Sequence, residues 1–281
     1  MSRKWVLRVT FILGFLLLCY PLVSSKVQQK KQEEAVNTYK EEVVSKGEEE
    51  IQNMRDNAEH YNDVLFQCQG AIVDNADMGI LSDDSYNSLL LQSNTGVMGS
   101  IEIPKIDVDL PIFHGTSDEV LSVSIGHQQG TSLPVGGENT HSCLTGHRGL
   151  PGAKLFTRLD EMTSGDLFFI NVLGETLAYK VYDIRVVEPN EAESYVATIE
   201  SGKDIVTLVT CTPYGLNTHR LLVSGERVPY EKTEYDSISS TMPSIRELIF
   251  TALPFVLIAV VGILKFNDWR KSKHHDEKKN I

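Results

Sequence analysis

The chain has 281 residues, of which 41% are hydrophobic and 23% charged, a composition typical of folded globular proteins and unlike that of disordered or collagen-like chains. Its net charge is −12, and Lys and Arg gather at the two ends, so the middle of the chain is strongly acidic. This charge distribution excludes a broad attraction to phosphates, and we predict no nucleic acid partner.

The first predicted element is an apolar segment near the N-terminus. Residues 9–23 (VTFILGFLLLCYPLV) carry no charge, and with residues 5–7 they approach the roughly 20 residues of a membrane-spanning helix. The same stretch could be the apolar part of a secretory signal peptide, but no Ala-x-Ala-like cleavage site stands before Lys26. We therefore predict that residues 1–25 comprise a cytoplasmic start and a transmembrane or signal-anchor segment.

Residues 26–66 are predicted to form an amphipathic helical segment. They are rich in Lys, Glu and Gln, and their apolar residues recur at helical spacing in two stripes separated by Gly47, where we expect a break. The stripes comprise Val36, Tyr39 and Val43, then Ile51, Met54, Ala58, Tyr61 and Leu65. We interpret this segment as a spacer packed on the next domain. Residues 67–96 have weak periodicity and are predicted to be a lid-like loop region with a short helix around Tyr86–Leu91.

From Val97 the apolar residues alternate with a period of two, as in half-buried β-strands. This alternation covers residues 101–112, and further strand-like runs lie at residues 143–145, 167–172, 177–187, 205–210 and 221–228. Turn signals such as PVGG and GLPG separate these runs. Residues 97–228 are therefore predicted to form a closed or sandwiched all-β domain.

A second apolar segment follows the β domain. Residues 229–247 are predicted to be a polar linker, residues 248–264 (LIFTALPFVLIAVVGIL) a transmembrane helix, and residues 265–281 a basic cytoplasmic tail. Because Lys- and Arg-rich flanks stay cytoplasmic, the region between the two spans should lie outside the cell membrane.

Three of the four cysteines, Cys68, Cys143 and Cys211, lie in the extracytoplasmic region. Because three is an odd number, at least one thiol of the monomer must remain free of intramolecular pairing. Cys211 stands where a buried strand meets a loop, a common position for catalytic residues. If the strands on either side of residues 212–219 pair as antiparallel neighbours, Arg220 lies close to Cys211.

A guanidinium near a thiol has a chemical use. It can favour the thiolate and can stabilise an oxyanion, which are two needs of acyl transfer by cysteine. A proton shuttle is also needed, for which histidine is the usual side chain. The extracytoplasmic candidates are His60, His114, His127, His141, His147 and His219. We expect His60 to be solvated, His114 and His127 to be surface or loop residues, and His141 to be structural.

Three motifs in this order resemble those of the sortase family. TLVTC at residues 207–211 with Arg220 nine residues later is similar to the sortase cysteine and arginine signature, and TGHRG at residues 145–149 is similar to the sortase histidine motif. The runs CTPYGLNTHRLLV, TSLPVGG and TGHRGLP are similar to those of class C, pilin-polymerising sortases, and so are the two flanking spans. The resemblance covers residues 97–228 in motif detail.

This resemblance implies an eight-stranded sortase β-barrel with an N-terminal helical segment and two flanking transmembrane helices. It implies Cys211 as nucleophile, His147 as general acid and base, Arg220 as stabiliser of substrate and oxyanion, and no metal or other cofactor. The implied substrate is an LPxTG-type sorting signal, cleaved between Thr and Gly through a thioester. The implied acceptor is a pilin lysine amine at a Gram-positive-type cell surface.

Two alternatives remain open from the sequence: transfer of surface proteins to a cell-wall precursor amine, and a membrane-tethered β domain that binds surface partners without chemistry. A zinc site at His141, Cys143 and His147 is disfavoured because no fourth ligand stands at a familiar spacing. Class C sortases usually carry an Asp-Pro-aromatic lid, which residues 67–96 lack. Asp77-Met78 and Asp84-Ser85-Tyr86 are only loose substitutes, so we do not expect lid autoinhibition.

Overall fold

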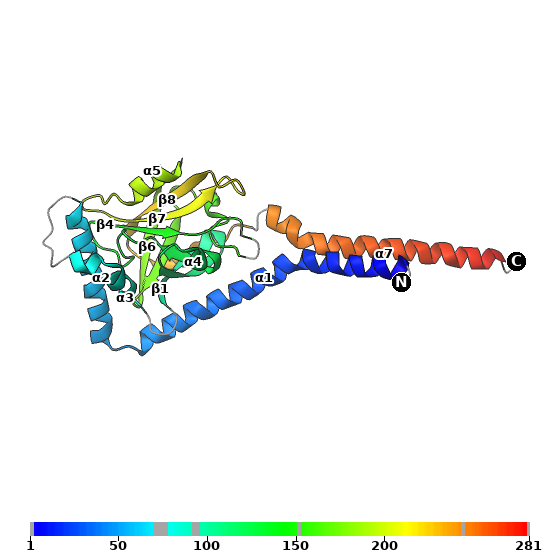
Figure 1. Cartoon of the computed structure of the whole chain (residues 1–281), viewed down its shortest axis with the longest axis horizontal. Coiled ribbons are helices and arrows are strands. Elements are labelled where there is room, and N and C mark those ends of the chain that lie inside the picture. Colours follow the sequence, from blue (N-terminus) through cyan, green and yellow to red (C-terminus); the bar gives the residue numbers. More distant parts are fainter. Residues whose placement is uncertain (1–2, 70–77, 92–95, 151–152, 243–244, 280–281) are drawn as a thin grey trace. The chain divides into compact units, whose positions relative to one another are not determined.

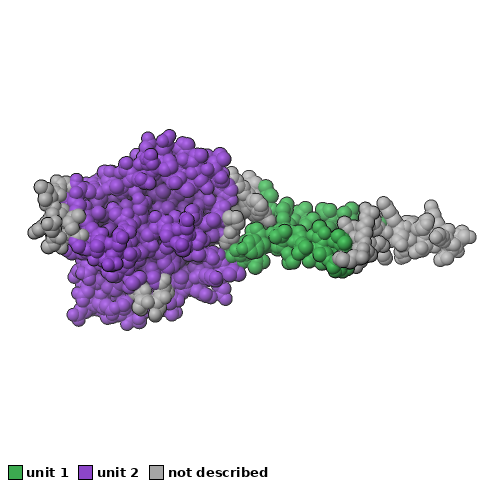
Figure 2. Space-filling model, in the orientation of Figure 1, with its two compact units in different colours: residues 1–26, 242–281 green, residues 27–241 purple. Residues whose placement is uncertain are grey.

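The computed structural model describes residues 3–69, 78–91, 96–150, 153–242 and 245–279. The chain divides into two compact units, one made of residues 1–26 and 242–281 and the other of residues 27–241 (Figure 2). The β-strands described in the structure all belong to the second unit.

The first unit is helical. It contains the start of α1 (Arg3–Ser45) and all of α7 (Ile245–Lys279) (Figure 1). Within the described residues, α1 is the one helix that is long and apolar enough to cross a membrane, with a mean hydropathy of 1.7 in its apolar part. The apolar stretch of α7, Thr251–Asn267, is shorter. Both predicted apolar segments are therefore helical, and the N-terminal one carries the stronger membrane signal.

The predicted helix break at Gly47 is confirmed. Helix α1 ends at Ser45 and α2 (Glu48–Cys68) begins after Gly47, which takes an extended conformation. Of the two predicted stripes, Tyr39 of α1 and Tyr61 of α2 are almost fully buried, because both stripes pack on the β domain. Asn62 joins α2 to the same domain by bonding both the carbonyl and the amide of Leu133.

Eight strands close into a barrel in the order β1-β2-β3-β4-β7-β8-β6-β5, which confirms the predicted fold class. The pairs β2/β3 and β4/β7 are parallel, and the remaining neighbours are antiparallel. The strands are β1 (Val97–Ile103), β2 (Val108–His114), β3 (Ile125–His127), β4 (Thr140–Thr145), β5 (Leu167–Val172), β6 (Glu175–Val187), β7 (Asp204–Thr212) and β8 (His219–Val228).

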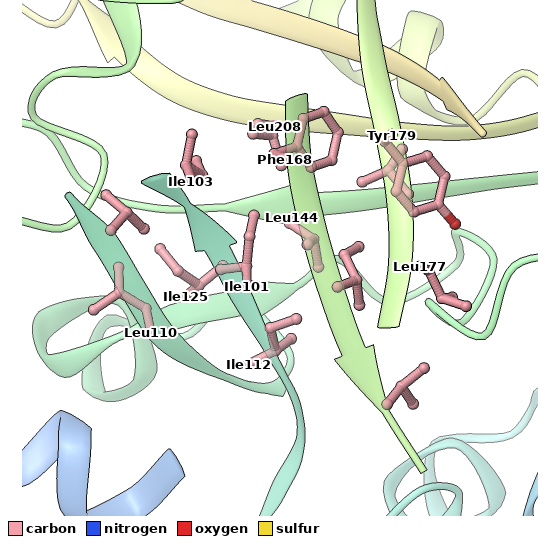
Figure 3. Close-up of a cluster of buried hydrophobic side chains, with 14 of the residues drawn as sticks. Ile101, Ile103, Leu110, Ile112, Ile125, Leu144, Phe168, Leu177, Tyr179 and Leu208 are labelled. Carbon is pink, nitrogen blue, oxygen red and sulfur yellow. The ribbon is translucent and has the colours of Figure 1, made fainter. Parts of the chain in front are cut away.

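Alternate side chains of the strands fill the barrel with aliphatic and aromatic groups, as the period of two predicts. Figure 3 shows Ile101 and Ile103 of β1, Leu144 of β4 and Leu208 of β7 among these inward side chains. The barrel interior is therefore a packed core, and chemistry must take place at its rim or on its outer face.

Several short elements that the residue pattern did not predict lie before, between and after the main strands. They are η1 (Met78–Leu81), η2 (Pro104–Ile106), α4 (Asp118–Val123), β3, η3 (Leu159–Glu161), α5 (Pro189–Val196) and α6 (Lys232–Ser237). Helix α6 falls in the stretch that we expected to be a linker, and its Tyr235 packs against Phe169 of β5 and bonds Glu102 of β1. That stretch is therefore partly folded onto the barrel.

The lid-like region is described only in part, since residues 70–77 and 92–95, including Asp77, lie outside the described residues. The predicted short helix forms as α3 (Asp83–Ser88). Its Tyr86 is fully buried, and the Tyr86 hydroxyl accepts a hydrogen bond from the Gly115 amide and contacts His127 Nδ1 at 2.9 Å. Tyr86 thus docks α3 onto β2 and β3.

The expectation that His114 and His127 are surface or loop residues is wrong. His114 ends β2 and is half-buried, and His127 ends β3 and is fully buried. His127 Nε2 donates to the Ser132 carbonyl at 2.8 Å, which leaves Nδ1 to accept from Tyr86. Burial lowers the pKa of His127 to about 4, so this network holds a neutral imidazole.

Acid should therefore weaken the fold through His127. Between pH 7 and 5 the unfolded chain protonates this histidine while the folded chain does not, so the unfolded state binds more protons and stability falls. The wild type should lose about 2 kcal/mol more unfolding free energy over this interval than His127→Gln. Urea unfolding of both proteins at the two pH values measures the difference, and equal losses would contradict a buried neutral His127.

Candidate active site

Cys211 and Arg220 occupy facing positions on two neighbouring strands. In the antiparallel β7/β8 pair, Cys211 is the direct partner of Arg220. Side chains of directly opposed residues project from the same side of a sheet with their Cβ atoms about 5 Å apart. Both residues are half-buried. The structure therefore brings the predicted thiol and the predicted guanidinium together at one end of the β7/β8 pair.

His147 emerges beside the same strand end. Strand β4 runs parallel to β7, with Thr145 opposite Val209, and the Gly146 amide donates to the Val209 carbonyl at 3.0 Å. His147 follows Thr145 by two residues, and Cys211 follows Val209 by two residues. His147 thus lies just beyond the end of β4, and Cys211 is the penultimate residue of β7, so the parallel register places both at the same end of this strand pair.

Gly146 lets the chain leave β4 in close contact with its surroundings. A Cβ atom at this position would lie 2.5 Å from Ile125 Cδ1 and 2.7 Å from Phe156 Cδ2, so a side chain would force the backbone before His147 to shift. The Gly146 carbonyl also accepts a hydrogen bond from Thr210 Oγ1 at 2.7 Å. Packing and hydrogen bonding together fix the residue that precedes His147.

The side-chain alternation places Cys211 and Arg220 on the outer face of the barrel. A second apolar cluster lies on that face and comprises Cys143, Val209 and Leu222 of the barrel with Ala192 and Val196 of α5. Cys211 lies two residues beyond Val209, and Arg220 lies two residues before Leu222. Because residues two apart on a strand project from the same face, both side chains lie on the face that carries this cluster. Figure 1 shows α5 beside β7 and β8. The candidate site thus borders an apolar wall built by α5.

The Arg220 guanidinium is oriented by its own turn. Its Nη1 donates to the carbonyls of Asn217 and His219, at 3.3 and 3.2 Å. His219 is exposed, pairs with Thr212 in the β7/β8 ladder and points to the opposite side from Arg220. Of the two adjacent residues, Arg220 is therefore the one on the side of Cys211.

The other candidate cysteines and histidines are placed differently. Cys143 is fully buried, its thiol donates to Gln128 Oε1 at 3.3 Å, and burial raises its pKa to about 12, so it remains a neutral thiol. His141 contacts the Thr198 carbonyl and Thr207 Oγ1 through its two ring nitrogens, as expected of a structural histidine, and burial lowers its pKa.

Cys68, which we placed in the irregular stretch, is instead the last residue of α2. His60 is exposed on the same helix, as predicted. Among the residues that the structure describes, no three His, Cys, Asp or Glu side chains gather in a way that could hold a metal ion.

Arg148 is a residue whose surroundings the sequence did not reveal. In the sequence it is only one residue of the TGHRG motif, yet its side chain is 6% exposed and its Nη1 donates to Thr212 Oγ1 at 3.1 Å. Its position directly after a candidate catalytic histidine is the sequence feature that could have marked it as a residue of the site. Its partner could not be inferred because Thr212 lies 64 positions further along the chain.

Comparison with known proteins places the barrel in a family. The sortase domain model matches residues 101–228. Sortase C1 of Streptococcus agalactiae is 44% identical, with a TM-score of 0.62 over 70% of this chain and 100% of that chain. Sortase C of Clostridium perfringens with a C-terminal cell wall sorting motif is 43% identical, with a TM-score of 0.59 over 69% of this chain and 98% of that chain.

A third solved structure, sortase C of Streptococcus pneumoniae, was described in connection with catalysis and pilin substrate specificity. It is 41% identical, with a TM-score of 0.60 over 70% of this chain and 97% of that chain. These identities extend over nearly the full length of the related chains. The chain belongs to the sortase family of cysteine transpeptidases, and its structural neighbours are class C sortases.

Proposed function

We propose that this sortase cleaves an LPxTG-type sorting signal between Thr and Gly and joins the new acyl group to a pilin lysine amine. Cys211 is the nucleophile, His147 the general acid and base, and Arg220 the stabiliser of the substrate carbonyl and its oxyanion. The observation that carries this assignment is the register of β4, β7 and β8. It supports a site in which Cys211 faces Arg220 while His147 leaves the neighbouring strand beside it.

The reaction is two successive acyl transfers. His147 holds the proton of the Cys211 thiol while the sulfur attacks the threonine carbonyl carbon, and Arg220 donates hydrogen bonds to the oxygen as negative charge develops there. When the C–N bond to glycine breaks, His147 protonates the leaving amine and a thioester remains on Cys211. The lysine amine then attacks the thioester carbonyl and gives its proton to His147. An isopeptide bond forms, and the Cys211 sulfur leaves.

Cys143 supports this assignment by contrast. It is the other cysteine of the barrel strands, but its thiol is fully buried and its raised pKa keeps it protonated. A nucleophile must reach a peptide carbonyl as a thiolate. The half-exposed Cys211 at the strand end can reach a substrate carbonyl. Cys143 can neither reach a substrate nor form a thiolate readily.

Membership in an enzyme family removes the alternative of a surface-binding β domain without chemistry. Transfer to a cell-wall precursor amine remains the second candidate. The pilin acceptor is favoured by the class C neighbours and by the CTPYGLNTHR run. The description of the relative from S. pneumoniae mentions pilin.

The two apolar helices support a membrane-anchored enzyme. We propose that α1 and α7 both span the membrane, with their basic outer ends in the cytoplasm and residues 27–241 outside. The stronger support comes from α1, and the shorter apolar stretch of α7 would complete a two-span topology.

A competition between acceptors tests the function. Full-length enzyme in detergent is mixed with pilin subunits carrying the sorting signal, in the presence of an oligoglycine or other peptidoglycan-like amine. The proposal predicts a ladder of covalent pilin polymers joined through lysine, absent with Cys211→Ala. Efficient transfer to the small amine without a ladder would instead establish the cell-wall acceptor.

A further inference from the structure

Arg148 connects three segments around the candidate site. Its side chain is almost fully buried, at 6% exposure, and each of its nitrogens has a partner. Nε donates to the Thr157 carbonyl at 3.2 Å, Nη1 donates to Thr212 Oγ1 at 3.1 Å, and Nη2 pairs with the Asp160 carboxylate. The planar guanidinium fork suits such a three-way contact, because its five donors point in fixed directions.

The contact with Thr212 joins the two halves of the site. Arg148 directly follows His147, and Thr212 directly follows Cys211. The β4/β7 ladder ends with the bond from the Gly146 amide to the Val209 carbonyl. The bond from Arg148 to Thr212 continues this connection past the end of the β4/β7 ladder, at the strand end where the two proposed catalytic residues lie.

The backbone of His147 is also held from the other side. Its carbonyl accepts from the Phe156 amide at 3.2 Å, and the Gly149 amide donates to Thr157 Oγ1 at 3.3 Å. A Cβ atom on Gly149 would lie 2.9 Å from the Tyr214 ring, so the tyrosine of the β7–β8 loop lies directly against this backbone. The segment that follows His147 therefore contacts the end of β7 and the β7–β8 loop at two places, Arg148 with Thr212 and Gly149 with Tyr214.

Burying a guanidinium is costly, and a buried ionic network is weak evidence for stability alone. Such networks can instead select one arrangement of the chain segments that they join. Here the network joins the residues next to His147 and Cys211. The distance between the His147 imidazole and the Cys211 sulfur controls proton transfer. Misplacing reacting groups by about 1 Å can reduce a rate by roughly 100-fold.

We propose that Arg148 is a positioning residue that fixes His147 relative to Cys211 through its bond to Thr212. This inference rests on the proposed roles of His147 and Cys211. Loss of the Arg148–Thr212 bond disturbs the geometry of the reacting groups but leaves the substrate-binding surface in place. This loss therefore lowers kcat more than it raises KM. It also changes the pH profile of kcat/KM, since this profile reports the coupled ionisation of the free enzyme's catalytic pair.

Arg158 provides a matched control in the same domain. Its side chain is 8% exposed, it pairs with the Glu161 carboxylate at 2.9 and 2.7 Å, and it bonds Thr241 Oγ1. It thus repeats the burial, the carboxylate partner and the threonine partner of Arg148. It stands in the chain between Thr157 and Asp160, but its guanidinium bonds Glu161 and Thr241. Replacing either arginine by lysine removes the fork and keeps the charge.

The experiment measures kcat, KM, the pH profile and the urea midpoint for Arg148→Lys, Thr212→Val and Arg158→Lys in the full-length enzyme with a sorting-signal peptide. We expect Arg148→Lys to lower kcat by roughly 10- to 100-fold with KM changed less than about threefold, and to shift the pH profile. Thr212→Val keeps the arginine and removes only its acceptor, so it tests the link even if the arginine variant unfolds. Thr212→Val should also lower kcat.

Arg158→Lys should reduce the urea midpoint but preserve kcat and the pH profile. The inference is overturned if Arg148→Lys and Thr212→Val keep the wild-type kcat and pH profile, or if Arg158→Lys loses kcat to the same extent. A second outcome concerns only the proposed function: peptide cleavage by Cys211→Ala at the wild-type rate would refute the roles of Cys211 and His147, whatever Arg148 does.

Discussion

Replacing Cys211 with alanine should abolish both peptide cleavage and transpeptidation, with a loss of at least about 1,000-fold in kcat/KM. Alanine has no nucleophile for the threonine carbonyl, so the acyl-enzyme cannot form. His147→Ala should cause a comparable loss, because the leaving glycine amine is then not protonated. The double variant should be no worse than the more damaging single variant, since nucleophile and shuttle act as a unit.

Two controls distinguish these effects from general damage. Cys68→Ala removes a cysteine at the end of α2 and should keep activity within a few-fold of wild type. His219→Ala removes an exposed histidine adjacent to Arg220 that points away from the proposed site. If His219→Ala were as inactive as His147→Ala, the assignment of the proton shuttle would be wrong.

Arg220→Lys should reduce kcat by roughly 100- to 1,000-fold although it preserves the positive charge. The ammonium of lysine is a compact point charge, whereas the guanidinium can hold the Asn217 and His219 carbonyls through Nη1 and still direct other N–H groups toward a developing oxyanion. Steady-state kinetics with a sorting-signal peptide measure the loss.

Arg227→Lys is the matched control for this substitution. Arg227 lies further along β8 and faces Asp204 at 3.7 Å, far along the strand from Cys211. It should keep most of the activity. An Arg220→Lys enzyme with wild-type kcat would mean that Arg220 supplies only charge, and its role as an oriented hydrogen-bond donor would be lost.

The β-barrel was predictable because its strands are long enough to show a period of two. Alternating apolar residues mark β1, β2 and β6, since their inward side chains fill one core, whereas β7 is marked by a continuous run of buried residues. The three-residue strand β3 cannot show a period, so His127 was assigned to a loop although it is buried. Its burial depends on Tyr86 and Ser132, which only the tertiary structure brings to it.

The short helices were missed for a related reason. Helices of six to eight residues are unstable alone and form because the barrel surface buries one side of them. Helix α5 did carry a readable signal, since Pro189 stands at its first turn and Glu188 and Glu191 form a reciprocal capping box. These two features would have predicted a helix in residues 188–204.

The candidate site was predicted through residue chemistry and motif resemblance, and the strand register agrees with the expected nearness of Cys211 and Arg220. The Arg148 network was not predictable. Its partners are Thr157 in the turn before η3, Asp160 in η3 and Thr212 at the end of β7, and no local pattern of residues encodes such a contact.

Intact-protein mass spectrometry of the enzyme mixed with a sorting-signal peptide tests the central claim most directly. The account predicts an adduct with the mass of the peptide acyl fragment ending in threonine, released by hydroxylamine as a thioester and located on Cys211 by peptide mapping. The adduct should be absent from Cys211→Ala and strongly reduced in His147→Ala. An acyl adduct on Cys143 or Cys68, or turnover of the peptide by Cys211→Ala, would contradict the account.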